Sequence, residues 1–216
     1  MLRQLTVILA LAGLVAACSD PDRVTGGPAP RQQPYSFGPI RTGHWGIGPI
    51  REDSYFEQPV IQALFPRAKV QDVTLQISHD ETRDGIIVTQ DGTEIAEIAD
   101  GYGDYPHTDD PMIGQVRGFG PQVRGPGGET IGMSWKAARF DLSQCEIGVD
   151  RDRNTVICAR RGEGAITYQF AVPTWDSEEV PPEALMRKAA YLKAIIWSPP
   201  PMPGMSTEPP RDDDDS

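Results

Sequence analysis

The fold class of this 216-residue chain is decided by one stretch, Ile86-Ile87-Val88-Thr89-Gln90-Asp91-Gly92-Thr93-Glu94-Ile95-Ala96-Glu97-Ile98-Ala99. Two runs rich in β-branched residues flank Asp91-Gly92, a pair that favours the tight turn of a two-residue β-hairpin. We therefore predict antiparallel strands over residues 86–90 and 93–99. Ile95 and Ile98 break the strict alternation of the second strand, which indicates a β-bulge there.

The segments before this hairpin predict a helix followed by another strand. Apolar and polar residues alternate over 73–77, as in a half-buried strand. Ahead of it, Asp53 or Ser54 can cap a helix that Pro66 ends. The apolar stripe of this helix consists of Phe56, Val60, Ile61 and Leu64.

A similar order of elements recurs in the second half of the chain, which predicts an α+β fold. Antiparallel β-sheet with short helices packed on it is the arrangement that buries these faces. The recurrence suggests two helix-plus-meander halves, although the halves share no sequence identity. The expected elements are a helix capped by Ser134, strands over 144–149, 155–160 and 166–172, a helix over 183–190 and a strand over 193–197.

Between the halves, residues 100–128 are rich in Gly, Pro and Asp and predict one long irregular loop. Carboxylate oxygens suit divalent cations, so this acidic loop is a candidate site for a weakly bound cation, a small ligand or a partner. A solvated loop without a binding role fits the same composition. The candidate residues are Asp100, Asp104, Asp109 and Asp110, which alternate with Tyr102, Tyr105 and His107.

The first residues of the chain have the pattern of a secretory signal. Arg3 gives a basic start, residues 5–15 are apolar and uncharged, and small residues precede Cys18. The apolar run is short for a membrane span. A cysteine directly after the small residues resembles the bacterial lipoprotein signal, in which the cysteine thiol receives a diacylglycerol and the peptide is cut before it. We therefore predict that Cys18 is lipidated.

This signal predicts the organisation and location of the whole chain. Ser19 follows the lipidated cysteine, where an Asp would be the usual inner-membrane retention signal of enterobacteria, so we expect sorting to the outer membrane, facing the periplasm. The run Asp212–Asp215 and its neighbouring prolines cannot bury enough surface to fold. The expected parts are a signal peptide over 1–17, a lipidated Pro/Gly-rich tether over 18–44, a single periplasmic domain over 45–198 and a disordered acidic tail over 199–216.

The three cysteines divide into one anchor and one pair. With Cys18 consumed by the lipid, Cys145 and Cys158 remain, and an oxidising compartment favours a disulfide between them. A metal pair or a redox dithiol is the alternative. The spacing is too wide for a CxxC redox motif, and no histidine lies nearby in the sequence to complete a zinc set.

The net charge of the chain disfavours two classes of binding partner. The chain carries 20 basic and 31 acidic residues, a formal net charge of −11. This balance argues against nucleic acid and against an anionic bilayer surface as electrostatic partners.

The histidines and serines give weak signals for catalysis. His44, His79 and His107 all fall in predicted loops. His79-Asp80-Glu81 offers a base beside a carboxylate, but such a trio is more often a solvated turn. Ser134 lies in a sequence without the second glycine of a nucleophile elbow, so a helix cap is the better interpretation.

One motif imitates a calcium-binding loop. Residues 150–154, Asp-Arg-Asp-Arg-Asn, match its start, but the glycine at the sixth position is missing and Arg161 replaces the bidentate glutamate. We interpret these residues as a charged turn. We expect neither an enzyme, nor a cofactor, nor a metal centre.

Three motifs occur in a fixed order: Gly46–Ile50 before a helix ending at Pro66, Thr130–Met133 before a helix and Cys145, and Cys158 followed by Ile166–Phe170, Trp175 and Leu192–Trp197. Together they resemble the RpoE-regulated lipoprotein family, a group of enterobacterial envelope lipoproteins of unknown function. The resemblance spans roughly residues 45–197 and is strongest from Thr130 onward. It implies a periplasm-facing domain with a disulfide and no assigned catalytic residue. The long central loop and the tail after Trp197 depart from the family pattern.

These observations leave three functional hypotheses. We favour a structural or protein-interaction lipoprotein whose domain contacts an unidentified envelope protein. The alternative is a domain that binds a small ligand or divalent cation through the acidic central loop. The third is a hydrolase that uses His79 or His107 with a nearby carboxylate.

Overall fold

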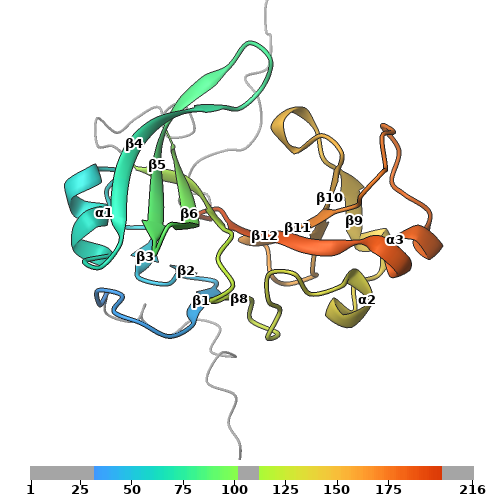
Figure 1. The fold of residues 1–216 in the computed structure, drawn as a ribbon, viewed down its shortest axis with the longest axis horizontal. Helices are drawn as coiled ribbons and strands as arrows, with labels where there is room; N and C mark the ends of the chain where they lie inside the picture. Colours follow the sequence, from blue (N-terminus) through green and yellow to red (C-terminus); the bar gives the residue numbers. More distant parts are fainter. Residues whose placement is uncertain (1–31, 102–111, 201–216) are drawn as a thin grey trace, which may run out of the picture.

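The structure, a computed structural model, describes residues 32–101 and 112–200. Its main element is an eight-stranded sheet in the order β4-β5-β6-β7-β12-β11-β10-β9 (Figure 1). Every neighbouring pair of strands in this sheet is antiparallel. The strands are β4 (Lys69–Gln76), β5 (Thr82–Gln90), β6 (Thr93–Asp100), β7 (Ile113–Gly118), β9 (Cys145–Ile147), β10 (Thr155–Ala159), β11 (Ile166–Ala171) and β12 (Tyr191–Trp197).

The large sheet consists of two four-stranded meanders that meet in its middle. The strands β4 to β6 lie on one side and β9 to β11 on the other, as Figure 1 shows. The last strands of the two halves, β7 and β12, pair with each other over a short stretch. In this pairing Val116 lies opposite Trp197, and Gly118 lies opposite Ile195. Each strand of one half has a counterpart at the same distance from this junction in the other half. The predicted α+β fold with two helix-plus-meander halves is therefore confirmed in topology.

Short helices precede and interrupt these meanders. The helix α1 comes before β4, α2 and η1 come before β9, and η2 forms the turn between β9 and β10. The helix α3 precedes β12, the last strand of the second half. Their bounds are α1 (Gln58–Leu64), α2 (Trp135–Ala138), η1 (Leu142–Gln144), η2 (Asp150–Asp152) and α3 (Glu183–Ala189). Among the helices of the described residues, none has the length and apolar character needed to cross a membrane.

A second, four-stranded sheet covers one face of the large sheet. It comprises β1 (Ile40–Gly43), β2 (Gly46–Ile47), β3 (Ile50–Arg51) and β8 (Val123–Arg124), in the order β3-β2-β1-β8. The segment predicted as a tether, 18–44, is therefore folded at its end, because Ile40 is buried and pairs in parallel with Val123 of β8. This strand was not predicted from the sequence. It is only four residues long, and although one partner, β2, follows it directly, the other partner, β8, lies far along the chain.

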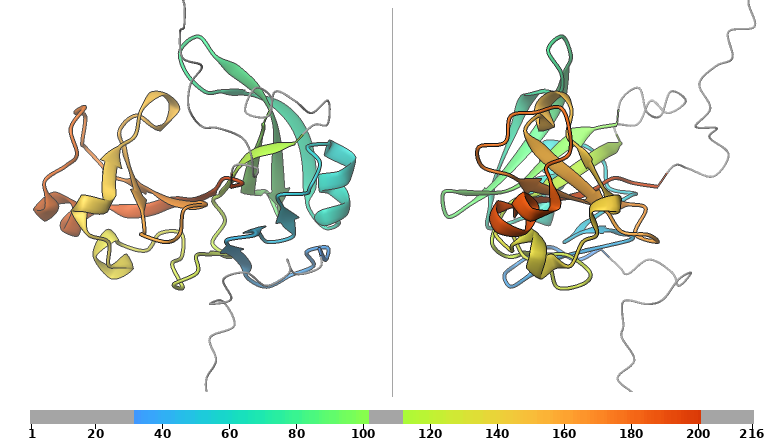
Figure 2. Two further views of the ribbon diagram at one scale, coloured as in Figure 1. Left: turned by 180° about the vertical axis from the view of Figure 1, so that it is seen from behind. Right: turned by 90° about the vertical axis from the view of Figure 1, so that its right-hand side faces the viewer.

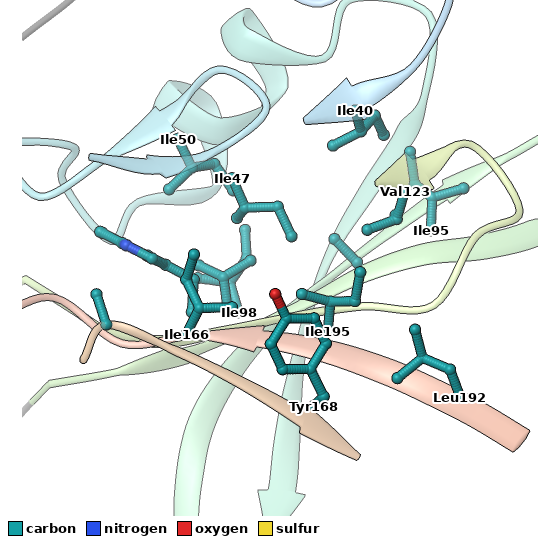
Figure 3. Packing of buried hydrophobic residues seen from close by; sticks show 14 of the residues in the cluster. Ile40, Ile47, Ile50, Ile95, Ile98, Val123, Ile166, Tyr168, Leu192 and Ile195 are labelled. Atoms are coloured by element: carbon teal, nitrogen blue, oxygen red, sulfur yellow. The ribbon is translucent and has the colours of Figure 1, made fainter. Parts of the chain in front are cut away.

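The apolar core lies between the two sheets. Figure 3 shows isoleucines of the small sheet pointing toward side chains of β6, β11 and β12. Tyr168 and Trp197 are completely buried in this core, as are Ile50 and Ile98. Burial of aromatic and branched side chains on this scale is the main force that holds the two sheets together.

The hairpin that decided the fold class forms as the sequence predicts. Asp91 has φ 50° and Gly92 has φ 76°, both in the left-handed region that a two-residue turn of this kind requires. The pairing of β5 with β6 changes register between Val88 and Thr89, and Ile95 has no counterpart on β5. The predicted bulge is thereby confirmed, and it explains why Ile95 and Ile98 are both buried.

Several local predictions were wrong. Residues 100–128 are not one loop, because they contain β7, a central strand, and β8. A Cβ atom added at Gly114 would lie 2.5 Å from the Asp100 carbonyl oxygen, so the close approach of the neighbouring strand requires glycine there. The first helix begins at Gln58 with Glu57 as its cap and not at Asp53 or Ser54, since Pro59 fits its first turn.

Candidate functional site

Most of the acidic loop lies outside the described residues. Asp104, Asp109, Asp110 and His107 are among these residues. Cys18, the residue predicted to be lipidated, also lies outside the described part of the chain. Asp100 is the last residue of β6 and pairs with Ile113 of β7. In the described part of the chain, no group of three or more His, Cys, Asp or Glu residues could hold a metal ion. The proposed cation or ligand loop therefore remains a prediction.

The predicted disulfide between Cys145 and Cys158 is present. The two residues face each other directly in the pairing of β9 with β10. Cys158 is completely buried, whereas Cys145 is partly exposed. The bond therefore fastens β9, an edge strand only three residues long, to the rest of the sheet.

A groove of about 810 Å³ lies between the tip of the β4–β5 hairpin and the turn that joins β9 to β10. Figures 1 and 2 show this tip and this turn on the same side of the sheet. The Arg151 backbone N–H donates to the Ile77 carbonyl oxygen at 3.2 Å, so the two walls touch at one point. The lining comprises Gln76, Ile77, Ser78, His79, Ile147, Gly148, Val149, Asp150, Arg151, Arg153, Ser177 and Glu178.

A buried network of charges holds the β9–β10 turn against the sheet. Arg117 of β7 donates from Nη1 and Nη2 to the two carboxylate oxygens of Asp152, at 2.6 and 2.7 Å. The Gln169 amide donates to the same carboxylate at 2.8 Å. Only 7% of the Arg117 side chain is exposed, so the bidentate pair is shielded from water. The turn is thus bound at Asp152 to both halves of the sheet.

A second ion pair of this network reaches the groove itself. Arg151 donates from Nη2 to both carboxylate oxygens of Glu97, each at 2.7 Å. The Glu97 side chain is 9% exposed and lies 3.8 Å from Arg117 Nε. Arg151 also lines the groove, so the buried charges fix the orientation of one of its walls.

Sequence reasoning missed this network, although weak signals for it exist. Glu97 stands in the run Ile95–Ala99, whose other residues are apolar, and Gln169 occupies the polar side of the cleanest alternating strand. Both side chains are nevertheless buried. A charged residue inside a strand that is buried on both faces indicates a buried partner. The partner residue itself cannot be identified from such a pattern.

The residues considered for catalysis are dispersed. His79 lines the groove and its Nδ1 lies 2.8 Å from Asp80, but both side chains are almost completely exposed. His44 contacts Trp45 edge to face and is not among the residues that line this groove. Ser134 is a helix cap, as predicted, and its hydroxyl accepts from the Ala137 backbone N–H. The positions of His44, His79 and Ser134 therefore give no support to the hydrolase hypothesis.

Another buried cluster lies on the core side of the second half. Arg160 pairs with the buried Glu129 at 2.5 Å and stacks over the ring of Phe140. The Tyr168 hydroxyl donates to Glu163 at 2.7 Å. Burial raises the pKa of Tyr168 above the usual tyrosine value of 10.0, and the bond to Glu163 raises it further.

This raised pKa predicts a loss of stability in alkali. In the unfolded chain Tyr168 loses its proton near pH 10, whereas in the folded chain it stays protonated. The resulting stabilisation is complete below about pH 10 and declines as the pH rises further. The free energy of unfolding between about pH 9 and pH 11 should therefore fall less steeply in Tyr168→Phe than in the parent chain. Tyr191→Phe, at a half-exposed site, is the control, and an equal slope in all three proteins would contradict the prediction.

Comparison with known proteins finds a similar solved structure but no match in sequence. No protein-family model matches the chain, and no curated protein matches it in sequence. Among solved structures, it is similar to the uncharacterized protein yfeY from Escherichia coli, with a TM-score of 0.54 and 17% identity. The two chains share a fold. The likeness covers 74% of this chain and 99% of the yfeY chain, and at this identity it establishes the fold and nothing further.

Proposed function

We propose that this protein is a bacterial envelope lipoprotein of the RpoE-regulated lipoprotein type, anchored through Cys18 on the periplasmic face of the outer membrane. The pairing of Cys145 with Cys158 carries the proposal. A stable disulfide requires an oxidising compartment, which agrees with the secretory pattern of the first residues. It also leaves Cys18 as the remaining cysteine, at the position that the lipoprotein signal requires.

The folded domain would act as a structural or interaction module and not as an enzyme. The groove beside the β9–β10 turn supports this role. The wall formed by the β9–β10 turn is held by buried ion pairs. The apolar side chains of Ile77, Ile147 and Val149 lie in the lining among charged ones, and Val149 is 68% exposed. Exposed apolar residues bordered by polar ones are typical of protein interaction sites.

Fractionation of the bacterial envelope tests the anchor. The parent chain should be found in the outer membrane, cleaved before Cys18 and carrying acyl chains that mass spectrometry detects. Cys18→Ser removes the thiol that receives the lipid, so the variant should lose both the acyl mass and the membrane attachment. Ser19→Asp is the matched control: it should stay lipidated but move to the inner membrane. Recovery of the parent chain uncleaved from the cytosol, with Cys18 unmodified, would refute the proposal.

A further inference from the structure

The walls of the groove are the ends of the two edge strands of the large sheet. Among the described residues, β4 and β9 each pair with one neighbouring strand. The Gly148 N–H donates to the carbonyl oxygen of Thr155, the first residue of β10. Because ladder hydrogen bonds alternate along an antiparallel pair, the backbone N–H and C=O of the preceding Ile147 point away from β10. No described residue pairs with that side of β9. An extended peptide could therefore hydrogen-bond there as an added strand.

Two arginines in the groove can accept carboxylates. Both bonds from Arg151 to Glu97 use Nη2, which leaves the hydrogens of Nε and Nη1 for another acceptor. The Arg151 side chain is 22% exposed, and its bonds to Glu97 already orient the guanidinium. Arg153 is 67% exposed and contacts Glu178 at 3.4 Å. Exposed pairs of this kind contribute little, so a ligand carboxylate can replace Glu178.

The remaining lining limits the charge of the ligand. Asp150 and Glu178 offset the two arginines, which disfavours a polyanion and favours a few separated carboxylates. Ile77, Ile147 and Val149 offer apolar contacts between the charged residues. An extended peptide places successive side chains on opposite faces, so alternation turns its acidic residues toward one side of the groove and its apolar residues toward the other.

We propose that the groove binds an extended segment of another protein in which acidic and apolar residues alternate. The carboxylates pair with Arg151 and Arg153, and the peptide backbone pairs with β9 at Ile147. This inference rests on the proposed function, because it specifies the partner of the interaction module.

Peptide binding to the full chain in detergent tests this inference. The probe is a fluorescent heptapeptide of alternating Glu and Val, compared with peptides that carry Lys or Ser in place of Glu. Fluorescence anisotropy should detect binding of the Glu peptide alone. Arg153→Glu should weaken it about tenfold or more, because it reverses a charge in the site. Lys136→Glu makes the same charge change on the exposed surface of α2 and should leave the affinity unchanged.

Hydrogen exchange locates the bound peptide. Residues 76–79 and 147–153 should exchange more slowly when it is present. Equal binding of the Ser peptide, equal affinities of the two variants, protection elsewhere, or a groove filled by a second copy of this chain would each overturn the inference. A lipidated chain in the outer membrane that binds no peptide would refute this inference alone. An unlipidated chain would refute the proposed function, whatever the peptide does.

Discussion

Arg117→Met should lower the free energy of unfolding by about 3–5 kcal/mol. The guanidinium of Arg117 neutralises Asp152 through two short hydrogen bonds and lies beside Glu97, and these side chains are largely buried. Methionine fills much of the same volume but leaves the Asp152 charge without its partner. Urea unfolding of the full chain, followed by tryptophan fluorescence, measures the loss.

Two further variants show whether buried charge is the cause. Arg187 forms an exposed pair with Glu183 on α3, so Arg187→Met should cost less than about 1 kcal/mol. The double variant Arg117→Met/Asp152→Leu removes both charges of the buried pair. It should recover part of the stability lost in Arg117→Met, because an apolar pair carries no uncompensated charge. If Arg117→Met cost no more than Arg187→Met, the network would have no role in stability.

The double variant Cys145→Ala/Cys158→Ala should lose about 3 kcal/mol of stability relative to the oxidised parent chain. The bond closes a loop between residues 13 positions apart, which restricts the unfolded chain. It also fastens β9, one wall of the groove, so the turn after β9 should exchange its amide hydrogens faster in the variant. Urea unfolding and hydrogen exchange of the same samples measure both effects.

A reductant provides the control for this second experiment. It should lower the unfolding midpoint of the parent chain toward that of the alanine variant, and it should leave the variant unchanged. A parent chain that resists urea equally well with and without reductant would show that the disulfide contributes nothing measurable to stability.

Elements that depend on near neighbours in the chain were predictable. The Asp91-Gly92 turn, the Ser134 cap and the alternation over 166–172 each involve residues within a few positions of one another. Their conformations follow from backbone sterics and local hydrogen bonds, which the amino-acid types alone determine. The disulfide was predictable for a different reason, because counting the cysteines left one pair.

Elements that depend on distant partners were not predictable. The strand β7 contains Gly114 and Gly118, which weaken strand propensity, yet it pairs with β6 and β12 on both sides. The hydrogen bonds to β6 and β12 stabilise β7 as a strand, although the residue types of β7 alone do not favour one. The strand β1 was likewise assigned to the tether. Its antiparallel partner β2 is adjacent in the chain but only two residues long, and its parallel partner β8 follows much later.

The amino-acid sequence by itself determined the Asp91-Gly92 hairpin, the Ser134 helix cap, most strands of the large sheet and the pair of cysteines, since each is set by short-range sterics, periodicity or residue type. Only the tertiary structure decided that β7 and β12 join the halves, and that Arg117 meets Asp152. These contacts join residues far apart in sequence. In the Arg117–Asp152 pair, burying either charge alone in a low-dielectric interior is unfavourable, so each charge needs its partner from another part of the chain.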